Sequence, residues 1–311
     1  MKDFGPIVPL VTPCNCAGVP DLIGLQAVCK EMLQVGCKGI FVAGSTGRGP
    51  WFSRADREKI CRAAAAQING VVPLIAGVSG SGLPDMVENA RVMAAAGAQL
   101  AVATVPGYYK YNPQEIETIY KEFADASPLP VMVYDIPEFT NTKLDKGMIL
   151  RLAQHGNIVA FKDSSADFER FQELLSALEG HPDFLLFQGK ENLIFDSLRL
   201  GASGFIVSFI HLAPPAFIHL YQATRGGNYD QAARIQEKIN QVLDLFHDTV
   251  EKRPESSTLF YILDYAVRQR GLCENLLLEQ DGESPLWLVE TAKKAVELCN
   301  EASNMSYLIN K

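Results

Sequence analysis

Residues 158–164 read Ile158-Val159-Ala160-Phe161-Lys162-Asp163-Ser164. The four apolar residues form a continuous run without alternating polar positions, which is typical of a strand buried on both faces. Such strands belong to parallel sheets whose faces are covered by helices. This segment therefore predicts an α/β protein in which Lys162 stands at the end of a buried strand.

The same arrangement recurs along the whole chain, because apolar runs alternate with segments of helical periodicity. The predicted strands are 6–11, 39–43, 72–76, 100–105, 130–134, 158–161, 184–187 and 204–207. The predicted helices between and after them are 21–35, 53–67, 83–96, 113–126, 144–155, 166–179, 191–200 and 213–225. Eight such units without a break in composition favour a closed (β/α)8 TIM barrel, and a doubly wound sheet is the alternative.

The end of the chain has no further strand pattern. We expect residues 1–227 to form the catalytic barrel and residues 228–303 to form a helical extension packed on it, with a tail at 304–311. The extension reads as three helices at 229–250, 256–270 and 285–303. Arg253-Pro254 and the acidic turn 279–285 separate them.

Composition narrows the classes of function. The 311 residues carry a formal net charge of −8 and no dense block of Lys or Arg, which argues against nucleic acid as a partner. No apolar stretch approaches the length of a membrane span, and the start of the sequence lacks a signal-peptide pattern. The seven cysteines form no framework, and the Cys14-x-Cys16 pair has no second pair to complete a zinc site. We therefore expect a cytoplasmic protein with reduced thiols and without a metal.

Catalytic side chains of such a barrel lie at the carboxyl ends of its strands. Burial of Lys162 at such an end would favour the neutral, nucleophilic amine, which can condense with a ketone. The alternative is a lysine that forms a salt bridge with Asp163 or Glu191.

Two further strand ends favour the first interpretation. Tyr134 ends the preceding strand and can carry the proton that imine formation and bond cleavage require. Gly44-Ser45-Thr46-Gly47 ends the second strand, and a glycine-flanked turn of this kind exposes backbone N–H groups to a small carboxylate. The structural alternative for Tyr134 is an aromatic lid, and that for residues 44–47 is a plain turn.

The strand-end motifs resemble those of the dihydrodipicolinate synthase and N-acetylneuraminate lyase superfamily of pyruvate-dependent class I aldolases, from about residue 5 to about residue 300. Residues 9–13 are similar to its opening strand, 44–47 to its carboxylate-binding G-[ST]-T-G, 133–137 to its Y-N-x-P segment, and 161–164 to its Schiff-base strand.

This resemblance implies that Lys162 forms the imine, that Tyr134 shuttles protons, and that Ser45 and Thr46 hold the pyruvate carboxylate. It also implies that Tyr108 crosses a dimer interface to the neighbour's threonine, within a homo-oligomer that is a dimer or a tetramer. The predicted catalytic residues are Lys162, Tyr134, Thr46 and Tyr108. The predicted substrate-binding residues are Ser45, Thr46, Arg48, Ser164, Gly189, Glu191 and Ser208.

Three positions depart from the family pattern. Arg48 replaces the glutamate that commonly follows G-[ST]-T-G, and Phe139 stands where dihydrodipicolinate synthases carry an arginine. In the seventh strand's loop, Lys190-Glu191 keeps one acidic residue where sialic acid lyases have two. Both of these named activities are therefore disfavoured. For Arg48 we consider two roles, a contact to a distal carboxylate or hydroxyl groups of the substrate and a surface salt bridge with Asp56 or Glu58.

The leading hypothesis is a lyase that reversibly splits a 2-keto acid, such as a 2-keto-3-deoxy sugar acid, into pyruvate and an aldehyde. Such a lyase would need no cofactor, because the covalent Schiff base forms through Lys162. One alternative is a dihydrodipicolinate synthase-type condensation or a keto-deoxy acid dehydratase on the same chemistry. Another is a catalytically silent barrel that binds a small keto acid.

Overall fold

The computed structural model describes residues 4–15, 17–250, 255–273 and 286–304. Eight parallel strands close into a barrel in sequence order, so that β1 pairs with both β2 and β8. The strands are β1 (Gly5–Pro9), β2 (Gly39–Val42), β3 (Leu74–Gly77), β4 (Leu100–Ala103), β5 (Val131–Asp135), β6 (Ile158–Asp163), β7 (Leu185–Gln188) and β8 (Gly204–Phe205). The predicted (β/α)8 barrel is confirmed, and the doubly wound alternative is wrong.

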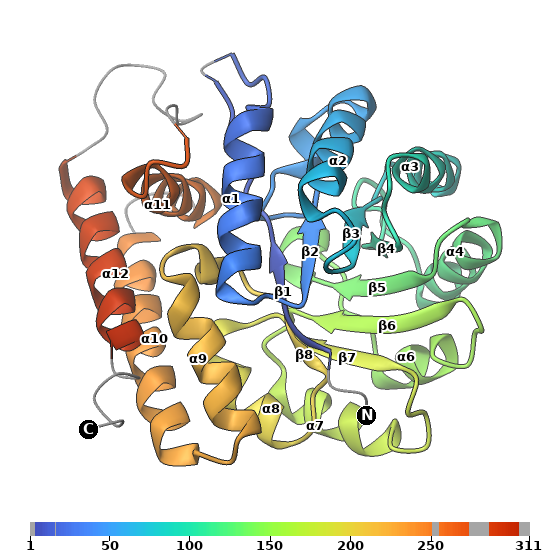
Figure 1. Ribbon diagram of the computed structural model, residues 1–311. Helices are drawn as coiled ribbons and strands as arrows, with labels where there is room; N and C mark the ends of the chain where they lie inside the picture. Colours follow the sequence, from blue (N-terminus) through green and yellow to red (C-terminus); the bar gives the residue numbers. More distant parts are fainter. Residues whose placement is uncertain (1–3, 16, 251–254, 274–285, 305–311) are drawn as a thin grey trace.

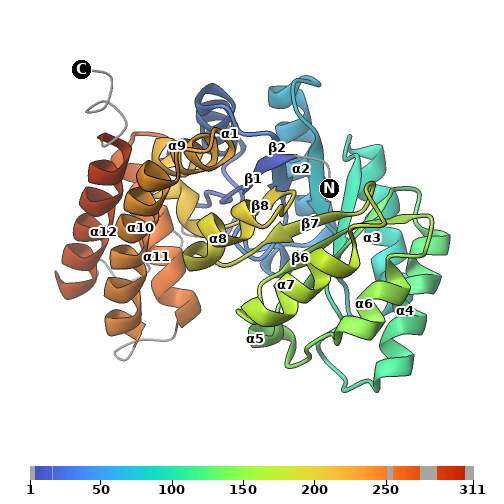
Figure 2. The ribbon, with the colours of Figure 1, turned by 90° about the horizontal axis from the view of Figure 1, so that it is seen from below.

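Helices surround the barrel, as Figures 1 and 2 show from two directions. They are α1 (Leu22–Val35), α2 (Arg54–Ile68), α3 (Leu83–Ala95), α4 (Pro113–Ala126), α5 (Pro137–Thr140), α6 (Lys146–Leu152), α7 (Phe168–Ala177), α8 (Ile194–Arg199) and α9 (Pro214–Arg225). Short 3-10 turns are η1 (Gly49–Trp51), η2 (Glu191–Leu193) and η3 (Ser208–His211).

Local signals explain where these helices begin and end. Ser53 accepts a hydrogen bond from the Asp56 N–H at the start of α2, and Asn112 forms a capping box with Glu115 at the start of α4. Gly36 ends α1 with a φ of 94°, a conformation that favours glycine.

Several element boundaries differ from the prediction, and two of the differences lie near the carboxyl end of the barrel. The short helix α5 was not expected, and it follows β5 because Pro137 already has the backbone angle of a first helical residue. The last strand ends at Phe205, two residues before its predicted end, and the chain enters η3 at Ser208.

Apolar side chains fill the barrel interior. Phe41, Ile75, Met132, Phe187 and Ile206 are all buried in one cluster there. Tyr134 joins the same cluster. The barrel is therefore a packed core rather than a pore, and active sites of this fold lie at the carboxyl end of the strands.

The last three helices are α10 (Tyr229–Val250), α11 (Glu255–Gln269) and α12 (Leu286–Asn304). They lie together on one side of the barrel, at the left of Figure 1, where α10 packs against α9 and α12. The predicted tail lies outside the described residues, apart from Asn304 at the end of α12. No helix among the described residues is long and apolar enough to span a membrane.

Candidate active site

Lys162 and Tyr134 lie side by side at the carboxyl end of the barrel. They are register partners on β6 and β5, and the amino group of Lys162 is 3.9 Å from the centroid of the Tyr134 ring. Both side chains are almost fully buried, with 4% and 5% of their surface exposed. The strand ends thus bring a primary amine and a phenol to one point.

Neither carboxylate considered as a partner of Lys162 forms an ion pair with it. Asp163 points to the outer side of the sheet, since successive strand residues face opposite sides, and it accepts a hydrogen bond of 2.8 Å from Arg170. Glu191 accepts bonds from the backbone N–H groups of Ser208 and Phe209. Within the described part of the chain, no salt bridge of Lys162 occurs, and the interpretation as a paired structural lysine is wrong.

Ser164 and Gly189 complete the surroundings of the amine. The Ser164 hydroxyl lies 3.4 Å from the Tyr134 hydroxyl and donates to the Gly189 carbonyl at 3.3 Å. A Cβ atom at Gly189 would lie 3.1 Å from Cε of Lys162 and 2.1 Å from the Ser164 Oγ. Only glycine therefore lets the loop after β7 approach the lysine this closely.

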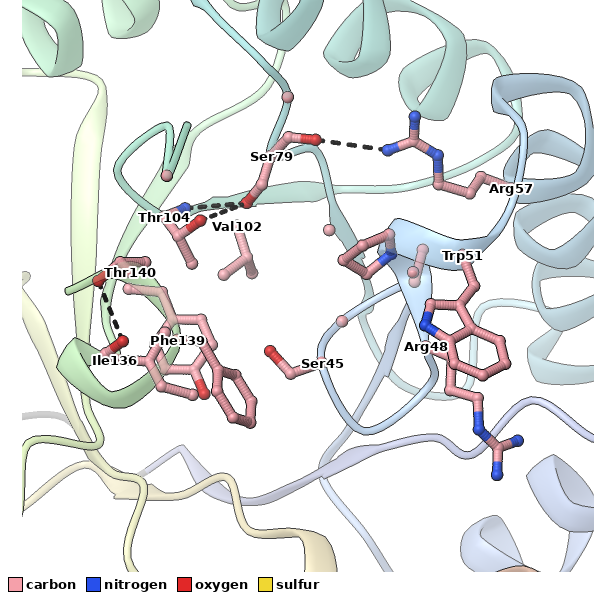
Figure 3. Close-up of a pocket in the computed structure, with 18 of the residues that line it drawn as sticks. Ser45, Arg48, Trp51, Arg57, Ser79, Val102, Thr104, Ile136, Phe139 and Thr140 are labelled. Atoms are coloured by element: carbon pink, nitrogen blue, oxygen red, sulfur yellow. Dashed lines mark hydrogen bonds between the residues drawn. The ribbon is translucent and has the colours of Figure 1, made fainter. Parts of the chain in front are cut away.

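The turn after β2 faces the same space. The Thr46 hydroxyl is 2.7 Å from that of Ser208, and Ser45 directs its hydroxyl into the cavity in Figure 3. No bond within the described residues uses the N–H groups of Ser45 or Thr46. These donors fit the predicted cradle for a carboxylate.

The turn η3 holds Ser208 in place through a buried histidine. The Nε2 atom of His211 lies 2.9 Å from the Pro9 carbonyl of β1. Burial lowers the pKa of His211 to about 3, so the ring is neutral and serves as a structural link. The sequence alone did not assign this role to His211.

The cavity at the barrel mouth has two lobes that share Ser45, Tyr134, Phe139 and Phe260. The lobe of about 570 Å³ contains Lys162 and seven other predicted site residues. These seven are Ser45, Thr46, Tyr134, Ser164, Gly189, Glu191 and Ser208. The second lobe, of about 700 Å³, is drawn in Figure 3 and extends toward the ends of β3 and β4.

Arg48 requires a correction. Its side chain is buried and its guanidinium binds the carboxylate of Asp264 on α11, so the predicted surface salt bridge with Asp56 or Glu58 is wrong. Asp56 binds Lys59 and Glu58 binds Arg62 instead. In Figure 3 the guanidinium of Arg48 points away from the cavity.

Arg170 of α7 is a supporting residue that sequence reasoning missed. It lies 2.8 Å from both Asp135 and Asp163, which end β5 and β6 on the side opposite the cavity. Burial raises the pKa of Asp135 to about 6, although Arg170 opposes that shift. The three charges join the two strands directly behind Tyr134 and Lys162. The sequence offered one signal for this role, because Arg170 is a charged residue beside Phe171 on the apolar face of a predicted helix.

Tyr108 lies apart from the other predicted catalytic residues. It is 82% exposed in the single chain and packs edge to face against Tyr109, with ring centroids 4.8 Å apart. In the single chain, Tyr108 therefore does not line either lobe of the cavity.

No group of three or more His, Cys, Asp or Glu ligands occurs among the described residues. Cys14 is a buried free thiol whose pKa is raised to about 11 by burial, and Cys16 lies outside the described residues.

Comparison with known proteins gives one consistent result. A sequence model of the dihydrodipicolinate synthetase family matches residues 3–276. The 4-hydroxy-tetrahydrodipicolinate synthase 1 of Streptomyces coelicolor is 32% identical over 74% of each chain. The probable 2-dehydro-3-deoxy-D-pentonate aldolase YjhH of Escherichia coli is 28% identical over 78% of this chain and 81% of its own.

A solved structure has the same fold. It is that of YagE from Escherichia coli, described as belonging to the dihydrodipicolinic acid synthase family and determined in complex with pyruvate. The two structures superpose with a TM-score of 0.85 at 24% identity, over 95% of this chain and 99% of the other.

Proposed function

Because the chain belongs to the dihydrodipicolinate synthetase family, whose members are carbon–carbon lyases or synthases, we propose that Lys162 forms a Schiff base with pyruvate. The enzyme reversibly cleaves a 2-keto-3-deoxy sugar acid to pyruvate and an aldehyde. The observation that carries this proposal is the buried amine of Lys162 beside the Tyr134 ring, with Asp163 and Glu191 engaged elsewhere.

In the first step, the Lys162 nitrogen attacks the keto carbon, and loss of water leaves an iminium ion. The Ser45 and Thr46 N–H groups hold the adjoining carboxylate. Tyr134 carries the protons that enter and leave the departing oxygen.

In the second step, the C4 hydroxyl gives its proton to Tyr134, which passed its own proton to the departing water, and the C3–C4 bond breaks. Its electron pair moves into the iminium ion to form an enamine, and the aldehyde departs. Protonation of C3 and attack by water then release pyruvate and regenerate the Lys162 amine.

The side chains that line the outer part of the Lys162 lobe support the proposal that the aldehyde is neutral and carries hydroxyl groups. Arg48, the side chain considered for a second carboxylate, binds Asp264, and Lys190 in this lobe lies 3.4 Å from Glu138. Glu237, Asn240 and Asp244 line the lobe from α10, at spacings that place them on one helix face. All three groups accept hydrogen bonds from hydroxyls, and the two carboxylates repel anions. The likeness to a pentonate aldolase agrees with this class of substrate.

We also propose a homo-oligomer in which Tyr108 of one copy reaches Thr46 of another. The exposed Tyr108–Tyr109 pair supports it, because large aromatic side chains are enriched at protein interfaces. Sedimentation of the native chain tests this assembly, and a monomer at working concentration would contradict it.

Borohydride reduction in the presence of pyruvate tests the Schiff base. Intact mass should rise by one reduced pyruvyl unit, and peptide mapping should locate it on Lys162. Lys190→Ala is the matched control, because Lys190 lines the same lobe, and it should trap normally. Normal trapping by Lys162→Ala would refute the assignment.

Product analysis with keto-deoxy sugar acids separates the remaining activities. Release of pyruvate supports the lyase. Retention of all carbons supports a dehydratase, and trapping without turnover supports a silent binder.

A further inference from the structure

The turn that would hold the pyruvate carboxylate has an unusual backbone. Ala43 and Arg48 both have a φ of 54°, in the left-handed region that residues other than glycine seldom occupy. A Cβ atom at Gly49 or Gly77 would lie within 2.1 Å of the Ala43 carbonyl oxygen. Such a conformation persists only where surrounding contacts hold it.

The backbone of Arg48 closes this turn. Its N–H donates to the Ser45 carbonyl at 3.0 Å, and the Gly49 N–H donates to the Gly44 carbonyl at 2.9 Å. A movement of Arg48 is therefore transmitted to Ser45 and to the N–H groups beside it.

The side chain of Arg48 is anchored outside the barrel, on the C-terminal helix α11. Its guanidinium binds Asp264 and lies 4.7 Å from the Phe260 ring centroid. The Trp51 ring packs edge to face on the same Phe260 at 6.4 Å. Arg48 and Trp51 thus both attach the loop after β2 to α11.

The Arg48–Asp264 pair is a strong constraint because it is buried. The two side chains are only 2% and 7% exposed. Removal of one partner would leave an uncompensated charge that must move toward water. For Arg48, this movement would take the turn with it.

We infer that Asp264 is a positioning residue, which fixes the carboxylate cradle at Ser45 and Thr46 by holding Arg48 from α11. This inference rests on the proposed function, since it assumes that the cradle binds pyruvate. It gives the helical extension an indirect part in substrate binding, through Arg48, although α11 follows the barrel in sequence.

The test compares Asp264→Asn with Lys238→Met, which removes the exposed Lys238–Glu301 pair of the same helical extension. In Asp264→Asn, the pyruvate concentration for half-maximal borohydride trapping should rise roughly tenfold or more. This is the effect expected when the displaced turn loses a hydrogen bond to the charged pyruvate carboxylate. The rate at saturating substrate should stay within a few-fold, since Lys162 and Tyr134 are not touched. Lys238→Met should match the wild type in both.

A second variant separates positioning from a folding defect. Arg48→Asp combined with Asp264→Arg restores the pair, and aspartate tolerates the left-handed conformation better than most residues. The double variant should recover most of the pyruvate affinity. A folded Asp264→Asn with unchanged half-saturation, or a double variant without recovery, would overturn the inference.

Amide hydrogen exchange provides a readout that does not depend on pyruvate. The N–H groups of Arg48 and Gly49 should exchange faster in Asp264→Asn, because both close the turn. If the wild type fails to trap pyruvate, the proposed function is wrong, but the exchange rates of these two amides still show whether Asp264 fixes the turn. Equal exchange rates in Asp264→Asn and the wild type would refute the positioning role of Asp264.

Discussion

The amino group of Lys162 lies 3.9 Å from the centroid of the Tyr134 ring, and the two residues are register partners on adjacent strands. The ring packs against the amine and limits where it can lie, while the phenol oxygen remains available for hydrogen bonding. Its hydroxyl is 3.4 Å from Ser164, which follows Lys162 by two residues. One tyrosine can thus both position the amine and carry protons.

Tyr134→Phe separates these two roles, because it keeps the ring and removes the hydroxyl. We expect kcat to fall by roughly 10²–10⁴-fold, the usual contribution of general acid–base catalysis. Steady-state kinetics measure this loss, and thermal unfolding checks that the fold is kept. A variant within a few-fold of the wild type would remove Tyr134 from the mechanism.

Gly189→Ala should impair both folding and catalysis. The added methyl group would meet the Ser164 hydroxyl at 2.1 Å and the Asp163 carbonyl at 2.7 Å, so the loop after β7 must shift. We expect a loss of about 1–3 kcal/mol of unfolding free energy, typical of overpacking. Urea unfolding and borohydride trapping measure the two effects.

Gly180→Ala is the matched control, because a Cβ atom there meets nothing within 4 Å. It should behave as the wild type. Equal stability of the two alanine variants would show that the approach of Gly189 to Lys162 is not needed.

The barrel could be predicted because its signals are local. Each strand is an apolar run, and helix starts such as Ser53 and Asn112 carry their own caps. Once a barrel is assumed, strand ends converge, and this places Lys162, Tyr134 and Ser45 together without any structure.

The supporting contacts could not be predicted, because they join residues far apart in the chain. Arg48 and Asp264 are separated by 216 positions. The only signal for Asp264 was a single acidic residue within the apolar stretch 261–267, which indicates a buried partner but not its identity. The acidic group of Glu191 was likewise expected to face substrate, whereas one of its oxygens accepts bonds from η3.

Asp135 should make stability depend on pH. Its pKa is raised by burial from the ordinary value of 3.8 to about 6, so the folded protein retains a proton that the unfolded chain releases. The stabilisation is present below pH 3.8 and is lost as the pH rises through about 6. Asp135→Asn removes this titration and leaves Arg170 paired with Asp163.

Urea unfolding of both proteins at pH 4 and pH 7 measures this effect. The stability of Asp135→Asn relative to the wild type should increase from the lower pH to the higher one. A difference that is constant with pH, or that changes in the opposite direction, would contradict the raised pKa.

Phe139 is the position at which the substrate class can be changed. It lines both lobes of the cavity and is 45% exposed, so a longer polar side chain can be accommodated without burying a charge. Dihydrodipicolinate synthases resemble this chain but carry an arginine at the corresponding place. Restoring it would supply the free guanidinium that Arg48 cannot provide while it binds Asp264.

Phe139→Arg should therefore favour aldehydes that bear a carboxylate. Condensation with pyruvate measures kcat/KM for an acidic and a neutral aldehyde of similar size. We expect the acidic-to-neutral ratio to rise by roughly tenfold or more, since a hydrogen bond to a charged group contributes about 1.5–3 kcal/mol. Phe139→Gln, which is polar and uncharged, should leave the ratio near the wild-type value. If both variants change the ratio equally, the effect comes from the space that Phe139 vacates, and residue 139 does not select the substrate by charge.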